Sequence, residues 1–349
     1  MPSSILVRTV RASCSEAHPL GTLLRYGALA TAGALCLACG GADPPGALGS
    51  SSAREHPLEA ASQSGARDFF PDGQTARPVP QEDACRKIDF LFVIDNSLSM
   101  ERQQANLARS FPGFMAVIAS ELRAVDFHVM VIDTDAMGPG EAVAAEKRAP
   151  STADEICDVT LGAGRRSSHT GSDCELASGA RFINASQQDL GDAFNCIGRV
   201  GTAGSSYEQP VGALLGATSA GLEAPGACNA SFLRDDAVLV VTIVTDEDDT
   251  VTAGEPAAWR ETLLRVKHGD DGALVLLGLV ADENLTAALD GGPCPLKDGT
   301  GAPRLQSFVD TFSFGSLGSV CAADYAPFFA RAVGVIGDAC QQFVPPAIR

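Results

Sequence analysis

The sequence predicts an α/β protein with a doubly wound, mostly parallel sheet and helices on both faces. One observation is that four short runs are almost wholly apolar, as parallel strands covered on both faces are: Ile88–Ile94, Phe127–Ile132, Ala237–Val244 and Ala273–Val280. The other is that amphipathic helical patterns lie between these runs. Strands that alternate with helices join through right-handed crossovers into a sheet of this kind.

Helices are expected at four places along the chain. The first has apolar residues at helical spacing, and Pro112 is expected to kink or split it: Leu107, Phe111, Met115, Ile118 and Leu122. The other three are expected at about Glu208–Leu222, Pro256–Val266 and Tyr325–Cys340. In addition, Ser186 and Asp189 have the spacing of a capping box, which predicts a short helix through Ile197.

Composition excludes several classes of protein. Of the 349 residues, 45% are hydrophobic and 19% are charged, which is typical of a globular chain rather than a disordered or multi-span membrane protein. The formal charge is −18, with 43 acidic residues against 25 Lys and Arg. Such acidity argues against non-specific binding to nucleic acid or to anionic membranes, because both require a basic surface.

Residues 1–38 are predicted to be a lipoprotein signal peptide. Arg8, Arg11 and Arg25 precede an uncharged apolar run, Tyr26–Ala38, which is shorter than the about 20 residues that span a bilayer. The run ends at Cys39 in a pattern that resembles a bacterial lipobox, with Cys39 as the acylated residue. Cleavage nearby by an ordinary signal peptidase is the alternative.

The remaining chain divides into a tether and one domain. Residues 39–84 are rich in Gly, Ser, Pro and Ala, which predicts a flexible tether or a tail with no spacing role, and residues 85–349 form the domain. Two polar, cysteine-bearing insertions are expected, at about 136–200 and 282–324. An even number of cysteines in an exported domain suggests disulfides, whose pairing stays open: Cys85, Cys157, Cys174, Cys196, Cys228, Cys294, Cys321 and Cys340.

Acidic residues follow the predicted strands. Asp95, Asp133 and Asp246 each close a strand, and Asp282 comes just after the fourth one. In open α/β sheets, ligands bind beyond the carboxyl ends of the strands, where the winding direction switches. From Asp95 to Ser99 the chain reads Asp-Asn-Ser-Leu-Ser, so alternate residues aim one carboxylate and two hydroxyls at one point. Oxygen ligands of this kind suit a hard divalent cation.

This Asp-x-Ser-x-Ser motif after a strand resembles the metal-ion-dependent adhesion site of von Willebrand factor A (vWA) domains, over about residues 85–340. The resemblance implies a vWA/Rossmann-like fold and a metal site with five ligands: Asp95, Ser97, Ser99, Asp246 and Thr202. Thr202 is the choice in the Gly-rich third loop, where Ser205, Ser206 or Glu208 could replace it. Glu208 and Asp248 are possible accessory residues. With the lipobox, the chain resembles the vWA lipoproteins of Gram-negative bacteria.

The resemblance also implies a function. Such domains bind proteins, and an acidic side chain of the partner completes the coordination of Mg²⁺, Mn²⁺ or Ca²⁺. We therefore expect no enzyme, no nucleic-acid partner and contact with a membrane through the N-terminal lipid only. The expected location is the cell envelope, either periplasmic or at the cell surface. Gly40 after Cys39 favours the outer membrane, because it is not an inner-membrane retention Asp.

Other interpretations of these residues stay open. The Asp-x-Ser-x-Ser motif could be an N-cap cluster, and residues 246–249 a solvated acidic turn or a calcium site, although Val251 excludes an EF-hand. Asp133-Thr134-Asp135 is interpreted as a polar loop that could touch a ligand. The chain could instead be a structural envelope protein with a degenerate, metal-free site, or a metal-assisted hydrolase using Asp95 and Asp246.

Enzymatic motifs are otherwise missing from the sequence. Three histidines fall in the domain, His128, His169 and His268, and His128 lies inside an apolar strand, where a packed side chain is expected. Phe314 replaces the first Gly of a nucleophile elbow at Gly315–Gly318. Neither a P-loop nor a dinucleotide-binding glycine motif is present.

Overall fold

The computed structural model describes residues 86–135, 152–205, 207–281 and 301–346. Several predictions concern residues outside these ranges and are not addressed by the structure: the signal peptide, Cys39, the tether, Cys85, Ser206, Asp282 and Cys294.

The described residues form a six-stranded sheet in the order β3-β2-β1-β4-β5-β6. Its strands are β1 (Lys87–Ile94), β2 (Asp126–Asp133), β3 (Ile183–Asn184), β4 (Val238–Thr245), β5 (Leu274–Val280) and β6 (Gly315–Ser319). All neighbours pair in parallel except β3, which runs antiparallel to β2 at one edge. The predicted α/β class and mostly parallel sheet are therefore confirmed.

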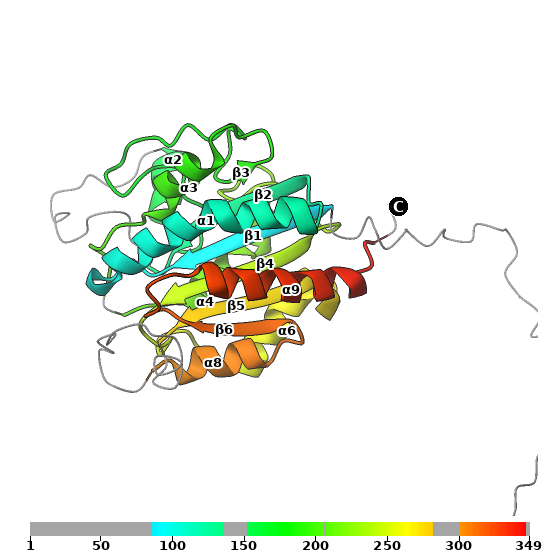
Figure 1. Cartoon of the computed structure of the whole chain (residues 1–349). Coiled ribbons are helices and arrows are strands. Elements are labelled where there is room, and N and C mark those ends of the chain that lie inside the picture. Colours follow the sequence, from blue (N-terminus) through cyan, green and yellow to red (C-terminus); the bar gives the residue numbers. More distant parts are fainter. Residues whose placement is uncertain (1–85, 136–151, 206, 282–300, 347–349) are drawn as a thin grey trace, which may run out of the picture. The chain divides into compact units, whose positions relative to one another are not determined.

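Helices cover both faces of the sheet, as predicted (Figure 1). Helices on one face are α1 (Glu101–Glu121), α3 (Leu190–Gly198) and α9 (Ala326–Gln342). The opposite face carries α4 (Pro210–Ala217), α6 (Pro256–Val266) and α8 (Pro303–Asp310). Shorter elements are α2 (Ala153–Asp158), α5 (Ala220–Glu223) and the 3₁₀ turns η2 (Leu98–Met100) and η4 (Asp271–Ala273).

Two apolar cores lie on the two faces of the sheet. Within β1, Phe90 and Phe92 face α1 and α9, whereas Leu91 and Val93 face the helices of the other side. This alternation follows from the two-residue repeat of a strand. Because both faces are covered, the central strands are apolar at nearly every position, which explains why they were visible in the sequence.

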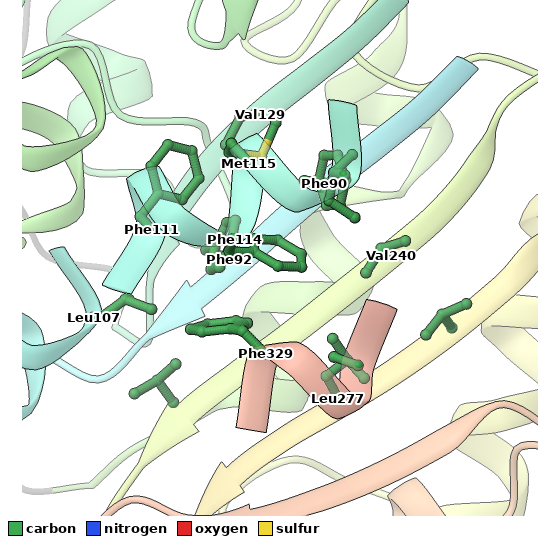
Figure 2. Close-up of a cluster of buried hydrophobic side chains, with 14 of the residues drawn as sticks. Phe90, Phe92, Leu107, Phe111, Phe114, Met115, Val129, Val240, Leu277 and Phe329 are labelled. Atoms are coloured by element: carbon green, nitrogen blue, oxygen red, sulfur yellow. The ribbon is translucent and has the colours of Figure 1, made fainter. Parts of the chain in front are cut away.

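Aromatic side chains fill the core beneath α1 (Figure 2). The rings of Phe111 and Phe194 are stacked, with centroids 3.6 Å apart, and Phe92 meets both of them edge-on. Further along α1, Phe114 packs against Phe329 of α9 with centroids 4.7 Å apart. These contacts hold α1, α3 and α9 together over the sheet.

Two details of the predicted helices are wrong. Pro112 does not split α1, which is one helix from Glu101 to Glu121, and the alternative of a kink at Pro112 stays a prediction. Helix α3 exists as predicted, but its N-cap is Asp189 and makes no side-chain capping bond. Ser186 instead donates its hydroxyl hydrogen to Asn184 over 2.6 Å.

Part of the segment 282–324, expected to be an insertion, belongs to the sheet and its helical layer. It contains α8 and the strand β6, whose sequence, Gly-Ser-Leu-Gly-Ser, has no apolar run to reveal it. The segment 136–200 contains α2, β3 and α3.

Disulfides are present, as the even number of cysteines predicted. Cys174–Cys196 lies within the segment 136–200, and Cys157–Cys228 joins that segment to the chain after α5. Cys321 and Cys340 are disulfide-bonded as well.

We predict that Phe111→Ala lowers the free energy of unfolding by about 3–5 kcal/mol, because it leaves a cavity between α1, α3 and the sheet. Urea unfolding followed by circular dichroism measures this loss. Val125→Ala is the control: Val125 is 62% exposed, so its truncation should cost less than about 0.5 kcal/mol. A cost below about 1 kcal/mol for Phe111→Ala would contradict the packing described above.

Candidate functional site

The candidate site lies where the strand order reverses. The chain proceeds from β1 to β2 on one side and later adds β4 on the other side of β1, so the carboxyl ends of β1 and β4 border a topological switch point. The backbone N–H of Asp95 donates to the carbonyl oxygen of Val244 over 3.0 Å. This bond extends the strand pairing and brings Asp95 beside the end of β4, which Asp246 follows directly.

The two predicted hydroxyl residues join these carboxylates. The oxygens Oγ of Ser97 and Ser99 are 3.1 Å apart, and Ser99 donates to Oδ1 of Asp246 over 3.0 Å. Ser97 donates its backbone N–H to Oδ1 of Asp95 over 2.7 Å. The four predicted residues of the first and second loops therefore form one connected group of oxygen atoms.

Asp95 is fully buried. The hydroxyl of Thr245 donates to its Oδ2 over 2.6 Å. Burial raises the pKa of the Asp95 carboxyl to about 7, and the nearby charge of Asp246 also raises it, whereas the hydrogen bonds from Thr245 and Ser97 lower it. A buried carboxylate with a raised pKa is a common feature of functional sites.

Hydrogen bonds to backbone atoms join the third loop to the first loop. Gln104 of α1 donates its side-chain N–H to the carbonyl oxygens of Asp95 and Gly201, over 3.0 and 2.7 Å. The N–H of Gly204 donates to the carbonyl oxygen of Asn96 over 2.9 Å. A Cβ at position 204 would lie 2.2 Å from Oδ1 of Asn96, so this close approach requires glycine.

Thr202 and Glu208, the two candidates in the third loop, lie in different surroundings. Thr202 is half-buried and lines a polar cavity together with Glu101, Gln104, His169 and Arg199. Glu208 is 1% exposed, and its Oε2 accepts a hydrogen bond from the hydroxyl of Thr134, which also contacts Asn96.

One oxygen of Glu208, Oε1, is buried without a hydrogen-bond partner. Burial raises the pKa of Glu208 to about 9, and the charge of Asp95 adds to this increase. Buried polar atoms are nearly always paired, so an unpaired one calls for an explanation such as a bound ion. The sequence predicts Glu208 as an alternative to Thr202 or as an accessory residue, and Glu208 lies two residues before Pro210, where α4 begins.

The acidic run 246–249 is not a solvated turn, because Asp248 and Asp249 each accept hydrogen bonds from the first residues of a helix. Asp248, the other accessory candidate, accepts hydrogen bonds from the backbone N–H groups of Arg304 and Leu305 at the start of α8, both over 3.0 Å. Asp249 is fully buried and accepts from the N–H of Val211 at the start of α4 over 2.9 Å. Carboxylates stabilise helix N-termini in this way.

The residues after β2 support the third loop. Thr134 is fully buried and Asp135 is 5% exposed, so the predicted polar loop is a buried one. Asp135 accepts from the N–H of Ser205 over 2.6 Å. Asp133 pairs with Arg165 over 2.7 Å, and burial raises the pKa of its carboxyl to about 6.

His128 is packed within the sheet, as predicted. Its Nδ1 lies 2.8 Å from the carbonyl oxygen of Phe232, its ring centroid is 4.3 Å from that of Phe182, and burial lowers its pKa. Asp89 is fully buried nearby and accepts from Nε of Arg234 over 2.8 Å. This charged group lies near the start of β1 and β2, at the edge of the sheet opposite the candidate site.

Neither the described residues nor the comparisons with known proteins identify a metal site, a membrane span or a family. No group of three or more His, Cys, Asp or Glu side chains in the described ranges is arranged to hold a metal ion. No helix in those ranges is long and apolar enough to cross a membrane. No protein-family model matches the chain, and no curated protein matches its sequence significantly.

We predict that, in chelator, the free energy of unfolding falls as the pH rises from about 5 to 8. Asp95 and Glu208 have ordinary pKa values of 3.8 and 4.5 and native values of about 7 and about 9. Between these values the native state binds more protons than the unfolded state, so rising pH destabilises it. Urea unfolding at several pH values measures the slope.

The variant Glu208→Gln should flatten this slope, because it removes a carboxyl group whose pKa is higher in the native state than in the unfolded state. Glu261→Gln, at an exposed carboxylate of α6, is the matched control and should keep the slope of the original chain. An unchanged slope in Glu208→Gln would show that Glu208 has a similar pKa in both states.

Proposed function

We propose that this chain is a divalent-cation-dependent protein-binding module of the vWA type, held at the cell envelope. The observation that carries the proposal is the convergence of Asp95, Ser97, Ser99 and Asp246 at the switch point of the sheet. Cation-dependent binding there would be recognition rather than catalysis.

The chemistry of these oxygen atoms fits a hard cation. Mg²⁺ binds oxygen ligands at 2.0–2.1 Å in an octahedron, which places neighbouring ligand atoms about 3 Å apart. The Ser97–Ser99 and Ser99–Asp246 oxygen pairs have separations of 3.1 and 3.0 Å. These spacings are also those of hydrogen bonds, so a cation would exchange hydroxyl–carboxylate bonds for bonds to itself with little movement of the loops.

Glu208 is our preferred ligand from the third loop, ahead of Thr202. The unpaired Oε1 of Glu208 is buried, and the charge of Asp95 acts on this carboxyl group. A cation bound by both carboxylates would supply the missing partner and offset their repulsion. Glu208 would have to move toward Asp95 and Asp246 to reach it, because the described acidic side chains do not form a group of three arranged to hold a metal ion. Thr202 lines the neighbouring cavity, where it could contact the partner instead.

The proposed partner is a protein that presents an Asp or Glu side chain. The chain carries a formal charge of −18, so an acidic partner would be repelled without a cation. A bound divalent ion with an open coordination position would attract a carboxylate of the partner at the cation site and so overcome this repulsion locally. Anchoring through a lipid on Cys39, with residues 40–84 as a tether, would place the module at the surface of a membrane.

A structural envelope protein is the second candidate. The observation that favours it is that the described His, Cys, Asp and Glu side chains do not form a metal-binding group of three or more. In that case the disulfide-linked residues between 152 and 228 would make contacts that need no metal. A metal-assisted hydrolase has less support, because His128 lies at the opposite edge of the sheet and His169 and His268 are exposed.

We predict that Mg²⁺, Mn²⁺ or Ca²⁺ at about 100 times its dissociation constant stabilises the protein by about 2.7 kcal/mol, which is several degrees in Tm. Thermal unfolding with cation and with chelator measures the shift. Asp95→Asn should abolish it. Asp133→Asn, at the end of the neighbouring strand, should lower the stability but keep the shift. No shift with any of the three cations would favour the structural protein.

We also predict that Glu208→Gln weakens cation binding by more than tenfold, because a charged ligand becomes a neutral one. Thr202→Ala should weaken binding by less than about threefold. Isothermal titration of both variants at the same pH gives the two dissociation constants. The reverse order would identify Thr202 as the ligand of the third loop.

A further inference from the structure

Two large apolar side chains project from the loops of the candidate site. Leu98 is 84% exposed and Tyr207 is 72% exposed. Scattered exposed apolar residues are ordinary on protein surfaces, so exposure alone does not indicate a function. The positions of these two residues relative to the proposed ligands are more informative.

Leu98 lies between the two hydroxyl ligands. The hydroxyls of Ser97 and Ser99 lie 3.1 Å apart, and Ser99 also donates to Asp246, whereas the side chain of Leu98 between them projects outward from the turn η2. The buried Met100 ends this turn, which leads directly into α1. Leu98 is therefore presented at the rim of the proposed cation site by the same turn that forms it.

Tyr207 occupies the equivalent place on the third loop. It directly precedes the buried Glu208, and its own N–H donates to Oγ of Ser205 over 2.9 Å. The hydroxyl of Thr134 contacts both Glu208 and Asn96, which lies two residues before Leu98. Tyr207 and Leu98 thus stand on two adjoining loops, both of which the buried hydroxyl of Thr134 contacts.

We propose, building on the function above, that Leu98 and Tyr207 are apolar anchors beside the cation. Their partner is then a protein segment in which large apolar side chains flank one Asp or Glu. The carboxylate of the segment would bind the cation, and the flanking side chains would cover Leu98 and Tyr207. The cation supplies the positive charge that an acidic residue needs on a protein with a charge of −18.

The charges around the third loop agree with this partner. Arg199 and His169 line the polar cavity beside Thr202, and both are exposed. Glu101 also lines that cavity, so its charge is mixed. A single acidic residue between apolar ones fits this surface better than a run of acids, because a run would meet Glu101 and the other carboxylates of the chain.

A peptide selection tests the proposal on the complete chain. The probe is a displayed library of short peptides with a fixed central Asp and randomised flanks, selected in Mn²⁺ and eluted with chelator. We expect enrichment of Leu, Ile, Phe, Tyr or Trp within two positions of the Asp. Leu98→Ser and Tyr207→Ser should each raise the Kd of the best peptide by about tenfold or more, because each removes an apolar side chain that the bound peptide would cover.

Val125→Ser and Val344→Ser are the matched controls. These side chains are 62% and 73% exposed, and they lie near the amino ends of the strands, before β2 and after α9. Both controls should bind the best peptide within about twofold of the original chain. All four variants should keep the rise of Tm with cation, since none of them removes a proposed ligand.

Failure of this proposal can be told from failure of the proposed function. Suppose that a cation raises Tm but the selected peptides show no preference for apolar flanks, or that no peptide is retained on the protein. The proposal of Leu98 and Tyr207 as anchors is then overturned, while the cation site stands. If Leu98→Ser and Tyr207→Ser bind the peptide as well as the controls do, the anchors are overturned too. If no cation raises Tm, the function on which they rest is itself wrong.

Discussion

The parallel pairing of β1 with β4 is the constraint on which the site depends. Two neighbouring parallel strands deliver their next residues to the same edge of the sheet, and the bond from the N–H of Asp95 to Val244 continues the pairing past the end of β1. Because of it, Thr245 reaches the carboxylate of Asp95 and Asp246 reaches the hydroxyl of Ser99. The helices and their two cores keep these strands in register.

Five acidic residues at this edge are buried, and Asp133 is nearly so, but their surroundings differ: Asp95, Asp135, Glu208, Asp246 and Asp249. Asp249 receives backbone N–H groups at the start of a helix, and Asp133 receives a guanidinium. Asp95 receives donors on both oxygens, whereas Glu208 receives one on a single oxygen. Leaving a buried polar atom unpaired costs about 1–3 kcal/mol. Glu223, near Asp89 at the opposite edge of the sheet, also has a buried unpaired oxygen, so the position of Glu208 beside Asp95, rather than this cost alone, supports the proposed cation site.

Much of this architecture could be predicted from the sequence, because central strands that are buried on both faces must be apolar along their whole length. The same reasoning could not find β6 or β3. The Gly-Ser-Leu-Gly-Ser strand carries no apolar run, and β3 has only two residues. Nor could it find the burial of Glu208, which depends on Thr134 from a distant loop. Loop residues whose neighbours come from elsewhere in the chain leave no local pattern.

Gln104 joins the first and third loops of the candidate site through its side-chain amide. One side-chain amide holds the carbonyl oxygen of Asp95 and both backbone groups of Gly201, so the first and third loops share a single polar bridge from α1. A ligand that moved one of these loops would strain the hydrogen bonds that hold the other. Linkage between two bound ligands is reciprocal. If a cation and a partner both bind at this edge, as proposed, any factor by which the partner changes the affinity for the ion equals the factor by which the ion changes the affinity for the partner.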